Sequence, residues 1–313
     1  MLRSDMPDVE AELDCAQLGA LQVELQAGTI VVRGPDRQTW LNGLITQDLA
    51  PKKPGDAAYG LIVGKTGKIQ SEAYVVLGDE DLLISIPEAA RAPALVEALD
   101  RYLVMENAEI AVASEPVSWL LALGLRANDA LDASRRAGAR GGLIRRGGLP
   151  TAVLAFGPAL RDTVVAAISE HAAPSVIASP EGWERVRIEH GIPERGPDWG
   201  EDTYPQEASL ELDGVSFSKG CYLGQEAVFM LEKRGHVKRR LVQIMVDGDV
   251  AVGDTLKDAE GNVVGAVTSR ILRPGRNLAL GYVKYKYAKS DTELVVGAES
   301  RGLVTVLLAV KTE

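Results

Sequence analysis

The sequence predicts an α+β protein of two domains. Its 313 residues exceed the usual size of one domain, and helical and strand patterns alternate along most of the chain. From Leu241 onward the pattern changes to short β runs broken by Gly, Asp and Asn, with no long helix between them. This spacing is typical of a small antiparallel barrel. We therefore place a boundary between a mixed domain of residues 1–236 and a C-terminal β-barrel of residues 237–313.

The first domain is predicted to begin with a strand and a helix. "GTIVVR" (28–33) has a strand pattern, and Pro35 after it suits the first turn of a helix. One helical stripe then collects the apolar residues Trp40, Leu41, Leu44, Ile45 and Leu49. The segments after this helix are predicted as strands at 57–63, 69–77 and 81–86, an amphipathic helix at 89–104 and a mixed α/β stretch at about 108–172.

The overall charge and composition narrow the classes of function. Lys and Arg number 34 against 44 Asp and Glu, so the net charge of −10 opposes a broad nucleic-acid-binding surface. The longest apolar stretches, such as "LVTVLLAV", are too short to cross a bilayer, and the acidic start lacks the apolar run of a signal peptide. Two cysteines make no disulfide framework. We expect a soluble protein of the reducing cytoplasm, with no membrane contact.

Glu189 is the first candidate binding residue. Ser179, Pro180 and Gly191 are typical of the two ends of a helix, which places Glu189 in its last turn. The helix dipole disfavours a carboxylate there. Glu189 either forms a surface ion pair with Arg185, four positions earlier, or is kept for recognition. A glutamate can accept two hydrogen bonds from an amino-pyrimidinone edge such as that of a pterin.

Cys221, in "SKGCYLGQEAV" (218–228), is the candidate reactive group. Helical spacing of the apolar residues after Gly220 predicts a helix there, with Cys221 at or just before its N-terminus and Lys219 two residues away. Unpaired N–H groups and a nearby ammonium favour the thiolate. The alternative is a buried structural cysteine. A resident metal cluster is not expected, since it needs about four ligands, although Cys221 as one ligand of a shared cluster stays open.

A basic run lies at 233–240. It contains Lys233, Arg234, Lys238, Arg239 and Arg240. Such a run is either a solvated loop or a surface that faces the glutamate tail of a folate or the phosphates of RNA.

Taken together, these motifs resemble the YgfZ family, the folate-binding relatives of the glycine-cleavage T protein that include the mitochondrial iron–sulfur assembly factor. The resemblance is carried by "RIEHGIPERGPDWGEDTYPQEASLE", "KGCYLGQEAV" and "KRRL". "VRGPDRQTWLNGLITQDL" is similar to the family's opening strand and helix, and "GAVTSRILRPGRNLALGYV" to its barrel, so the resemblance covers the whole chain. It implies a T-protein-like fold of two α/β lobes and a small antiparallel barrel around a central, folate-sized cavity.

The resemblance also implies roles for individual residues. Cys221 matches the family's characteristic thiol, with Lys219 beside it, and Glu189 matches the position that contacts the pterin. We also expect Gln225 and Arg234 to contact the folate. The implied ligand is tetrahydrofolate or a one-carbon derivative, and the implied partners are iron–sulfur client or assembly proteins.

Two positions depart from the pattern of the true aminomethyltransferases. Those enzymes carry aspartate where Cys221 stands, and a catalytic aspartate whose nearest match here is Ser71; Glu72 points to the opposite face of the strand. We therefore expect a tetrahydrofolate-binding accessory protein for maturation or repair of iron–sulfur proteins. The alternatives are a folate-dependent aminomethyltransferase, with Glu72 replacing the aspartate, and a tRNA-modification factor that uses the basic run.

Overall fold

A computed structural model describes residues 9–233, 237–273 and 275–307, and the chain divides into two compact units. Unit 1 comprises Met1–Val63, Gln70–Trp183 and Ser216–Leu223, and unit 2 comprises Gly64–Ile69, Glu184–Val215 and Gly224–Glu313. The first strand of the barrel begins at Arg239, close to the expected start at residue 237. Residues 184–215 nevertheless group with the barrel, so the units are interleaved along the chain and do not divide at residue 236.

The first sheet has five strands in the order β3-β4-β5-β2-β6. Its strands are β2 (Ala27–Arg33), β3 (Ala57–Val63), β4 (Ile69–Leu77), β5 (Asp81–Pro87) and β6 (Glu109–Val112). Alternate strand residues such as Ile30, Ala73 and Val75 share one buried core with residues of α2 (Arg37–Asn42) and α3 (Ala92–Asp100). The strands predicted at 28–33, 57–63, 69–77 and 81–86 are confirmed.

Helix α2 is shorter than its apolar stripe indicated. It ends at Asn42, and the stripe residues Leu44 and Leu49 lie beyond it but in the same core. The Gly43 amide donates to the carbonyls of the last helical turn, and the Asn42 side chain accepts a hydrogen bond from the Leu49 amide at 2.8 Å. The chain therefore folds back as a loop that buries the same apolar positions. Similarly, the helix predicted at 89–104 is a 3-10 turn, η1 (Ala89–Arg91), followed by the shorter α3.

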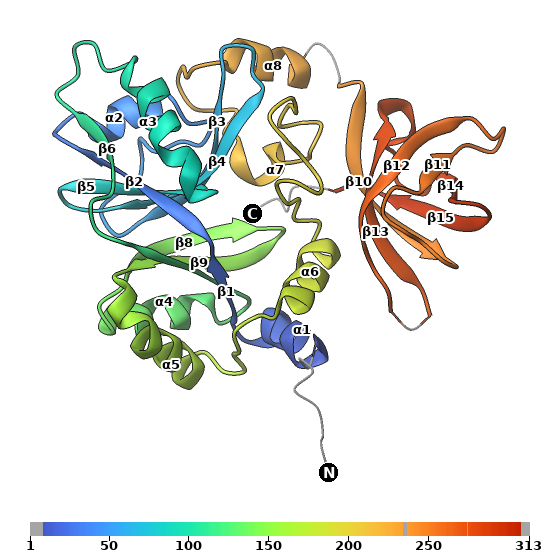
Figure 1. The fold of residues 1–313 in the computed structure, drawn as a ribbon, viewed down its shortest axis with the longest axis horizontal. Helices are drawn as coiled ribbons and strands as arrows, with labels where there is room; N and C mark the ends of the chain where they lie inside the picture. The colour runs from blue at the N-terminus through green and yellow to red at the C-terminus, as the bar shows by residue number, and fades with distance from the viewer. Residues whose placement is uncertain (1–8, 234–236, 274, 308–313) are drawn as a thin grey trace. The chain divides into compact units, whose positions relative to one another are not determined.

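The second sheet, also in unit 1, has four antiparallel strands in the order β1-β7-β9-β8. These are β1 (Leu21–Leu25), β7 (Ser118–Leu123), β8 (Arg140–Arg146) and β9 (Leu149–Phe156). Helices α4 (Ala127–Arg136) and α5 (Arg161–His171) cover one face (Figure 1), and their residues share a core with the strands. Helix α1 (Val9–Leu18) lies against β1, and η2 (Pro158–Leu160) precedes α5.

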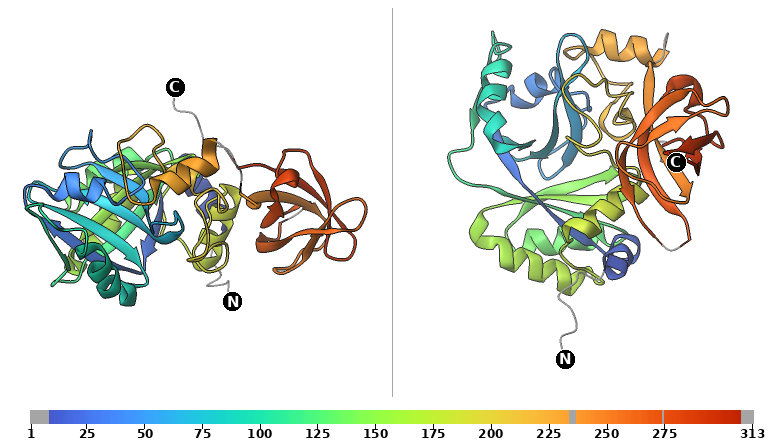
Figure 2. Two further views of the ribbon diagram at one scale, coloured as in Figure 1. Left: turned by 90° about the horizontal axis from the view of Figure 1, so that it is seen from above. Right: turned by 45° about the vertical axis from the view of Figure 1, so that its right-hand side comes forward.

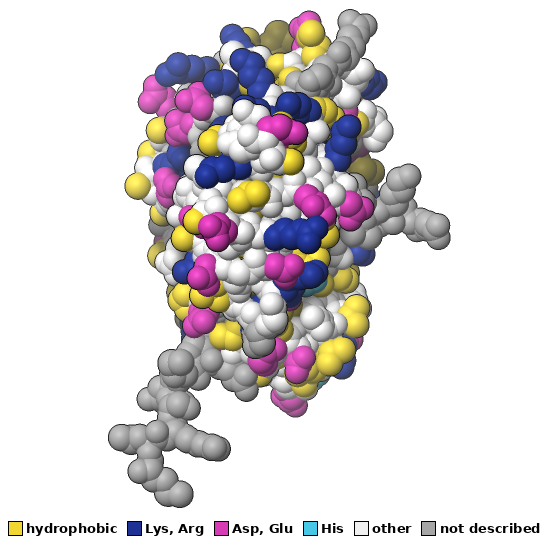
Figure 3. Space-filling view, turned by 90° about the vertical axis from the view of Figure 1, so that its right-hand side faces the viewer, with side chains coloured by type: hydrophobic (Ala, Val, Ile, Leu, Met, Phe, Trp, Pro, Cys, Tyr) yellow, Lys and Arg dark blue, Asp and Glu magenta, His cyan; other side chains and the backbone are white. Residues whose placement is uncertain are grey.

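Unit 2 contains the predicted barrel, which is closed in the order β10-β13-β12-β11-β14-β15 (Figure 2). Its strands are β10 (Arg239–Asp247), β11 (Thr255–Lys257), β12 (Val263–Ile271), β13 (Asn277–Lys284), β14 (Glu293–Val296) and β15 (Ser300–Thr305), and η3 (Tyr285–Tyr287) follows β13. Inward-facing residues such as Ile244 and Leu256 form its core. Two α/β sheets and a closed barrel confirm the predicted fold class. On the face drawn in Figure 3, Lys and Arg side chains gather towards the upper end, and acidic side chains lie among and below them.

Three helices precede the barrel in the sequence: α6 (Pro180–Glu189), α7 (Glu211–Gly214) and α8 (Gln225–Lys233). The predicted start of α6 is confirmed, because the Ser179 hydroxyl accepts a hydrogen bond from the Gly182 amide at 3.0 Å. Gly191 follows its end with a φ of 60°, which suits glycine. No helix within the described ranges is long and apolar enough to span a membrane.

Candidate functional site

Lys219 fixes the segment that carries Cys221, which we call the 216–223 loop and which lies in unit 1. Its ammonium donates hydrogen bonds to the carbonyls of Asn42 at 2.7 Å, Ile45 at 2.8 Å and Gln47 at 2.8 Å. Only 8% of Lys219 is exposed. Burial lowers the pKa of Lys219 to about 8, while the nearby Asp48 carboxylate acts in the opposite direction.

Two backbone hydrogen bonds tie both ends of the 216–223 loop to the same segment of chain. The Ser216 amide donates to the Thr46 carbonyl at 3.0 Å, and the Leu223 amide donates to the Gly43 carbonyl at 2.9 Å. The Leu223 side chain packs against the core of the five-stranded sheet. Cys221, between these anchors, is exposed. The structure thus presents this thiol to solvent from a loop that is held on either side of it.

Helix α8 does not begin where the sequence indicated. Its first residue is Gln225, so Cys221 lies four residues before the helix and outside its first turn. The intervening Gly224 has a φ of 77°, which makes a turn before the helix starts. The electropositive helix end expected at Cys221 is therefore not its immediate surrounding. Cys15, by contrast, is 2% exposed, and its burial raises the pKa of its thiol.

Glu189 is the last residue of α6, in unit 2, and its side chain is 15% exposed. Its Oε1 accepts hydrogen bonds from Arg185 Nε and Arg273 Nη1, each at 3.3 Å. The predicted ion pair with Arg185 is thus present, and Arg273 adds a second guanidinium from the turn between β12 and β13. Gln243 donates to the backbone carbonyls of Ile188 and Glu189 at 2.7 and 3.1 Å. The end of α6 is therefore fixed to the barrel strand β10, and the two arginines share one oxygen of the Glu189 carboxylate.

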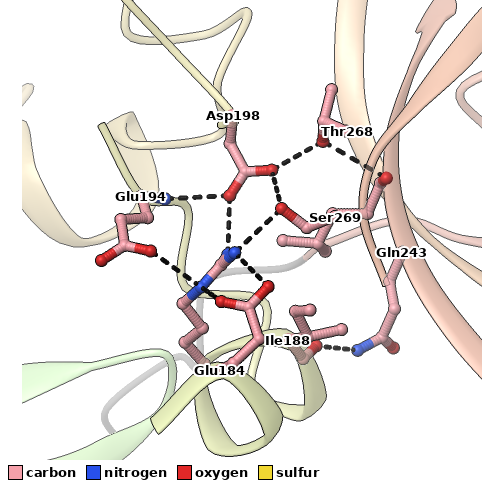
Figure 4. A network of polar contacts seen from close by, with 9 residues as sticks. Glu184, Ile188, Glu194, Asp198, Gln243, Thr268 and Ser269 are labelled. Carbon is pink, nitrogen blue, oxygen red and sulfur yellow. Dashed lines mark hydrogen bonds and ion pairs between the residues drawn. The ribbon is translucent and has the colours of Figure 1, made fainter. Parts of the chain in front are cut away.

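A buried arginine in α6 belongs to a second polar network in unit 2, whose labelled members include Glu184, Asp198 and Ser269 (Figure 4). Arg187 is 1% exposed, and its guanidinium makes two hydrogen bonds of 2.7 Å to Glu184 and one of 2.7 Å to Asp198 Oδ2. Asp198 Oδ1 accepts from the hydroxyls of Thr268 at 2.6 Å and Ser269 at 2.7 Å. One charge network thus joins helix α6, the segment around residue 198 and strand β12 within unit 2.

This network could not be found in the sequence. Arg187 occupies a helical position that looks like any surface arginine, and its partner Asp198 lies in an irregular segment. The hydroxyls of Thr268 and Ser269 come from about 70 residues further along the chain. No local spacing connects them.

The two faces of β4 separate Ser71 from Glu72, as the strand period predicts. The Ser71 hydroxyl donates to the Glu72 backbone carbonyl at 2.8 Å. The Glu72 carboxylate instead accepts from the Tyr59 hydroxyl at 2.9 Å and lies 4.0 Å from Arg146. The Arg146 guanidinium stacks 3.8 Å from the centre of the Tyr59 ring. Burial raises the pKa of Tyr59 well above its ordinary value, so this hydroxyl is a neutral donor.

The basic run is partly neutralised by acidic neighbours. Arg239 lies 3.6 Å from Glu207, with its guanidinium over the Tyr282 ring, and Arg240 pairs with the buried Glu211. Arg234, the expected folate contact, lies outside the described residues.

The expected site residues fall in both units. Cys221 and Lys219 belong to unit 1, whereas Glu189 and Gln225, the first residue of α8, belong to unit 2. Among the residues that the structure describes, no group of three or more His, Cys, Asp and Glu is arranged to hold a metal ion.

Comparison with known proteins shows that the chain is similar to aminomethyltransferases in sequence and in fold. No family model matches. The chain is 26% identical over 303 residues to the mitochondrial aminomethyltransferase of Mus musculus, and the match covers 88% of the chain and 74% of that protein. It is 28% identical over 223 residues to the tRNA-modifying protein YgfZ of Edwardsiella ictaluri, covering 68% of the chain and 66% of that protein.

Among solved structures, the glycine cleavage system aminomethyltransferase T of Bartonella henselae superposes with a TM-score of 0.76 at 20% identity. The match covers 97% of the chain and 90% of that protein. The chain therefore has the fold of the glycine-cleavage T protein. Its sequence is similar to aminomethyltransferases along most of its length, and the likeness to YgfZ proteins in particular is narrower.

Proposed function

We propose that this protein binds a reduced folate, tetrahydrofolate or a one-carbon derivative, and uses Cys221 in the maturation or repair of iron–sulfur proteins. The observation that carries the folate proposal is the T-protein fold over 97% of the chain, together with similarity to aminomethyltransferases over 88% of it. Fold alone does not fix function, so the proposal also depends on the chemistry of particular residues.

Glu189 is the residue proposed to recognise the pterin. A pterin presents two N–H donors on one edge, and a carboxylate can accept both. The guanidiniums of Arg185 and Arg273 hold the carboxylate in place through Oε1. A fixed, charged acceptor loses little entropy when a ligand binds, which supports its use in recognition.

Ser71 supports an accessory role over aminomethyl transfer. The transfer develops positive charge on the folate, and a carboxylate at this position of the strand would stabilise it. The Ser71 hydroxyl carries no charge and is occupied by the Glu72 carbonyl. The Glu72 carboxylate is on the other face, where Tyr59 engages it.

Aminomethyl transfer remains the second candidate, because several of the similar proteins are named aminomethyltransferases. The name of the Edwardsiella ictaluri protein suggests a third candidate, tRNA modification. The net charge of −10 opposes extended contact with RNA.

Calorimetric titration with tetrahydrofolate tests the binding proposal. Glu189→Gln should weaken binding by about 1.5–3 kcal/mol, or roughly one to two orders of magnitude, since a charged acceptor is lost. Glu181→Gln, on the exposed first turn of the same helix, is the matched control and should bind as the wild type does. Equal affinity of all three proteins would contradict the assignment of Glu189.

The role of the thiol is tested separately, in cells that lack the native protein. Cys221→Ser should fold normally but fail to support iron–sulfur enzyme activity, because the hydroxyl is a far weaker nucleophile and metal ligand than the thiolate. A glycine-cleavage exchange assay on the purified protein should show no aminomethyl transfer. Turnover at ordinary enzyme rates would favour the second candidate instead.

A further inference from the structure

We propose that Lys219 is a positioning residue for Cys221: its ammonium, seated among three backbone carbonyls, holds the 216–223 loop in the arrangement that presents the thiol. This inference deepens the proposed function and rests on it for the use of the thiol. The geometry of the loop stands independently of that function.

The three backbone carbonyls around the Lys219 nitrogen, which we call the seat, match the three N–H donors of an ammonium group. An ammonium has three N–H donors and no acceptor, and Lys219 meets three carbonyls, those of Asn42, Ile45 and Gln47, at 2.7–2.8 Å. Asn42 is the last residue of α2, where carbonyls point out of the helix end and attract a cation. All three hydrogens of the amine are therefore used, and its action on the thiol is through the loop.

Burial alternates with exposure along the loop so that Cys221 is turned outward. Lys219 and Tyr222 are 8% and 6% exposed, whereas Gly220 and Cys221 between them are exposed. The Tyr222 ring lies 5.2 Å from the Lys219 nitrogen, within the range of a cation–π contact. The Leu223 amide then bonds to the Gly43 carbonyl. Removal of the ammonium takes away all three of its hydrogen bonds. The chain is then no longer held on the N-terminal side of Gly220 and Cys221.

The seat should also respond to pH. A neutral amine has two N–H groups and a lone pair, so it cannot donate to three carbonyls at once. The charged and titratable groups that face the Lys219 nitrogen are the Asp48 carboxylate and the Tyr222 ring. Deprotonation gives up one hydrogen bond but removes the cost of burying the charge, which is why burial lowers the pKa of Lys219 from 10.5 to about 8. The seated loop therefore releases this proton more readily than a released loop does, and protection of the loop should rise as the pH rises from about 8 towards 10.5.

Hydrogen exchange read by mass spectrometry tests this in the full chain. In Lys219→Met, the amides of the 216–223 loop should exchange about tenfold faster or more than in wild type, as expected for the loss of charge-assisted hydrogen bonds. The strands β3 and β5 should be unchanged. Lys68→Met, which removes an exposed lysine paired with Asp202, is the matched control and should leave the loop protected.

Chemical rescue separates positioning from general destabilisation. In Lys219→Ala, ethylammonium chloride should restore protection of the loop and the wild-type rate of Cys221 alkylation. Tetramethylammonium chloride, which has no N–H donor, should restore neither. If the variants do not fold, the wild-type pH profile still decides, since the protection factor of the Leu223 amide should rise as the pH passes about 8.

Wild-type exchange in Lys219→Met, equal rescue by both salts, or a protection factor that does not rise as the pH passes about 8 would each overturn the inference. Its failure is distinguishable from that of the proposed function. A loop that responds as stated in a protein that does not bind tetrahydrofolate refutes only the folate proposal. Folate binding with an unresponsive loop refutes only the role of Lys219.

Discussion

The two cysteines differ in the properties that govern reaction with an external reagent. Cys221 is exposed, whereas Cys15 lies in α1 with 2% of its surface exposed and a raised thiol pKa. We predict that iodoacetamide alkylates Cys221 much faster than Cys15 at about pH 7.5, because Cys15 is buried and its burial raises the pKa of its thiol. Alkylation rates of Cys15→Ala and Cys221→Ser check this. Faster reaction of the protein that keeps only Cys15 would contradict it.

Asp258 should make the stability of the barrel sensitive to acid. It accepts hydrogen bonds from the Tyr287 hydroxyl at 2.6 Å and the Asn262 amide at 2.8 Å, and these lower its pKa from 3.8 to about 2. A lowered pKa means that the unfolded chain takes up the proton first. The stabilisation is therefore complete above about pH 4 and is lost as the pH falls towards 2.

Thermal melts of wild type and Asp258→Asn from about pH 2 to 6 measure this effect. The difference in melting temperature should be largest above about pH 4 and shrink as the pH falls. A difference that is the same at every pH would show that the hydrogen bonds to Asp258 do not depend on its charge.

At single residues, the sequence predicted contacts that lie within one helix and missed those that cross the fold. The pair of Arg185 and Glu189 follows from a spacing of four in a helix. Arg273, the second partner of Glu189, is 84 residues away, and the carbonyl partners of Lys219 are more than 170 residues away. Such contacts depend on tertiary packing, for which local patterns carry no signal.

At the scale of elements, the Arg187 network should stabilise the attachment of α6 to β12. Arg187→Met leaves the buried Asp198 carboxylate without its cation. Removal of one partner of a buried ion pair typically costs about 3–5 kcal/mol. We therefore predict a large fall in the free energy of unfolding, measured by urea titration.

Arg301→Met is the control for this prediction. Arg301 pairs with Glu293 across two barrel strands, but both side chains are exposed, and such pairs contribute about 0.2–1 kcal/mol. If Arg187→Met is no more destabilising than Arg301→Met, the buried network is not a major source of stability.

The predicted elements were most accurate where the apolar pattern and the backbone hydrogen bonding agree. Strands β3 and β4 match their predicted bounds: β3 is a run buried along its whole length, β4 alternates at its start, and turn residues separate the two. The apolar stripe that begins in α2 continues beyond the end of the helix. The loop after Asn42 buries the same side chains, and the Asn42 side chain accepts a hydrogen bond from the Leu49 amide in that loop. Helix α7 has only four residues, too few to show a period.

At the scale of the whole molecule, the fold class could be predicted because mixed helical and strand patterns give way near residue 237 to short β runs. The grouping of residues 184–215 with the barrel could not, because it follows from contacts such as those of Gln243 with the end of α6. The individual residues of the candidate site were predicted from the sequence and stay predictions, whereas the exposure of Cys221 and the contact of Arg273 with Glu189 come from the structure.

The overall charge leads to a prediction about RNA. Arg239 and Arg240 have acidic partners, and the chain carries a net charge of −10. Nonspecific binding of tRNA depends on release of counterions from many phosphate contacts, so we expect weak binding with a shallow salt dependence. Filter binding between about 50 and 200 mM salt measures it. Tight binding that falls steeply with salt would support the tRNA-modification candidate.

The order in which the chain visits its two units has a consequence for dissection of the protein. Each unit consists of three stretches, so the backbone passes from one unit to the other at five places. No single truncation can yield either unit by itself: residues 1–223 contain all of unit 1 but also two stretches of unit 2, and residues 64–313 contain all of unit 2 but also two stretches of unit 1. A chain that ends before residue 216 lacks the Cys221 loop of unit 1 as well as the barrel. A chain cut once in a loop between residues 70 and 183 should instead yield two fragments, neither of which contains a whole unit, so that they must associate before either unit can form. Fragment complementation, and not the expression of isolated domains, is therefore the way to divide this molecule.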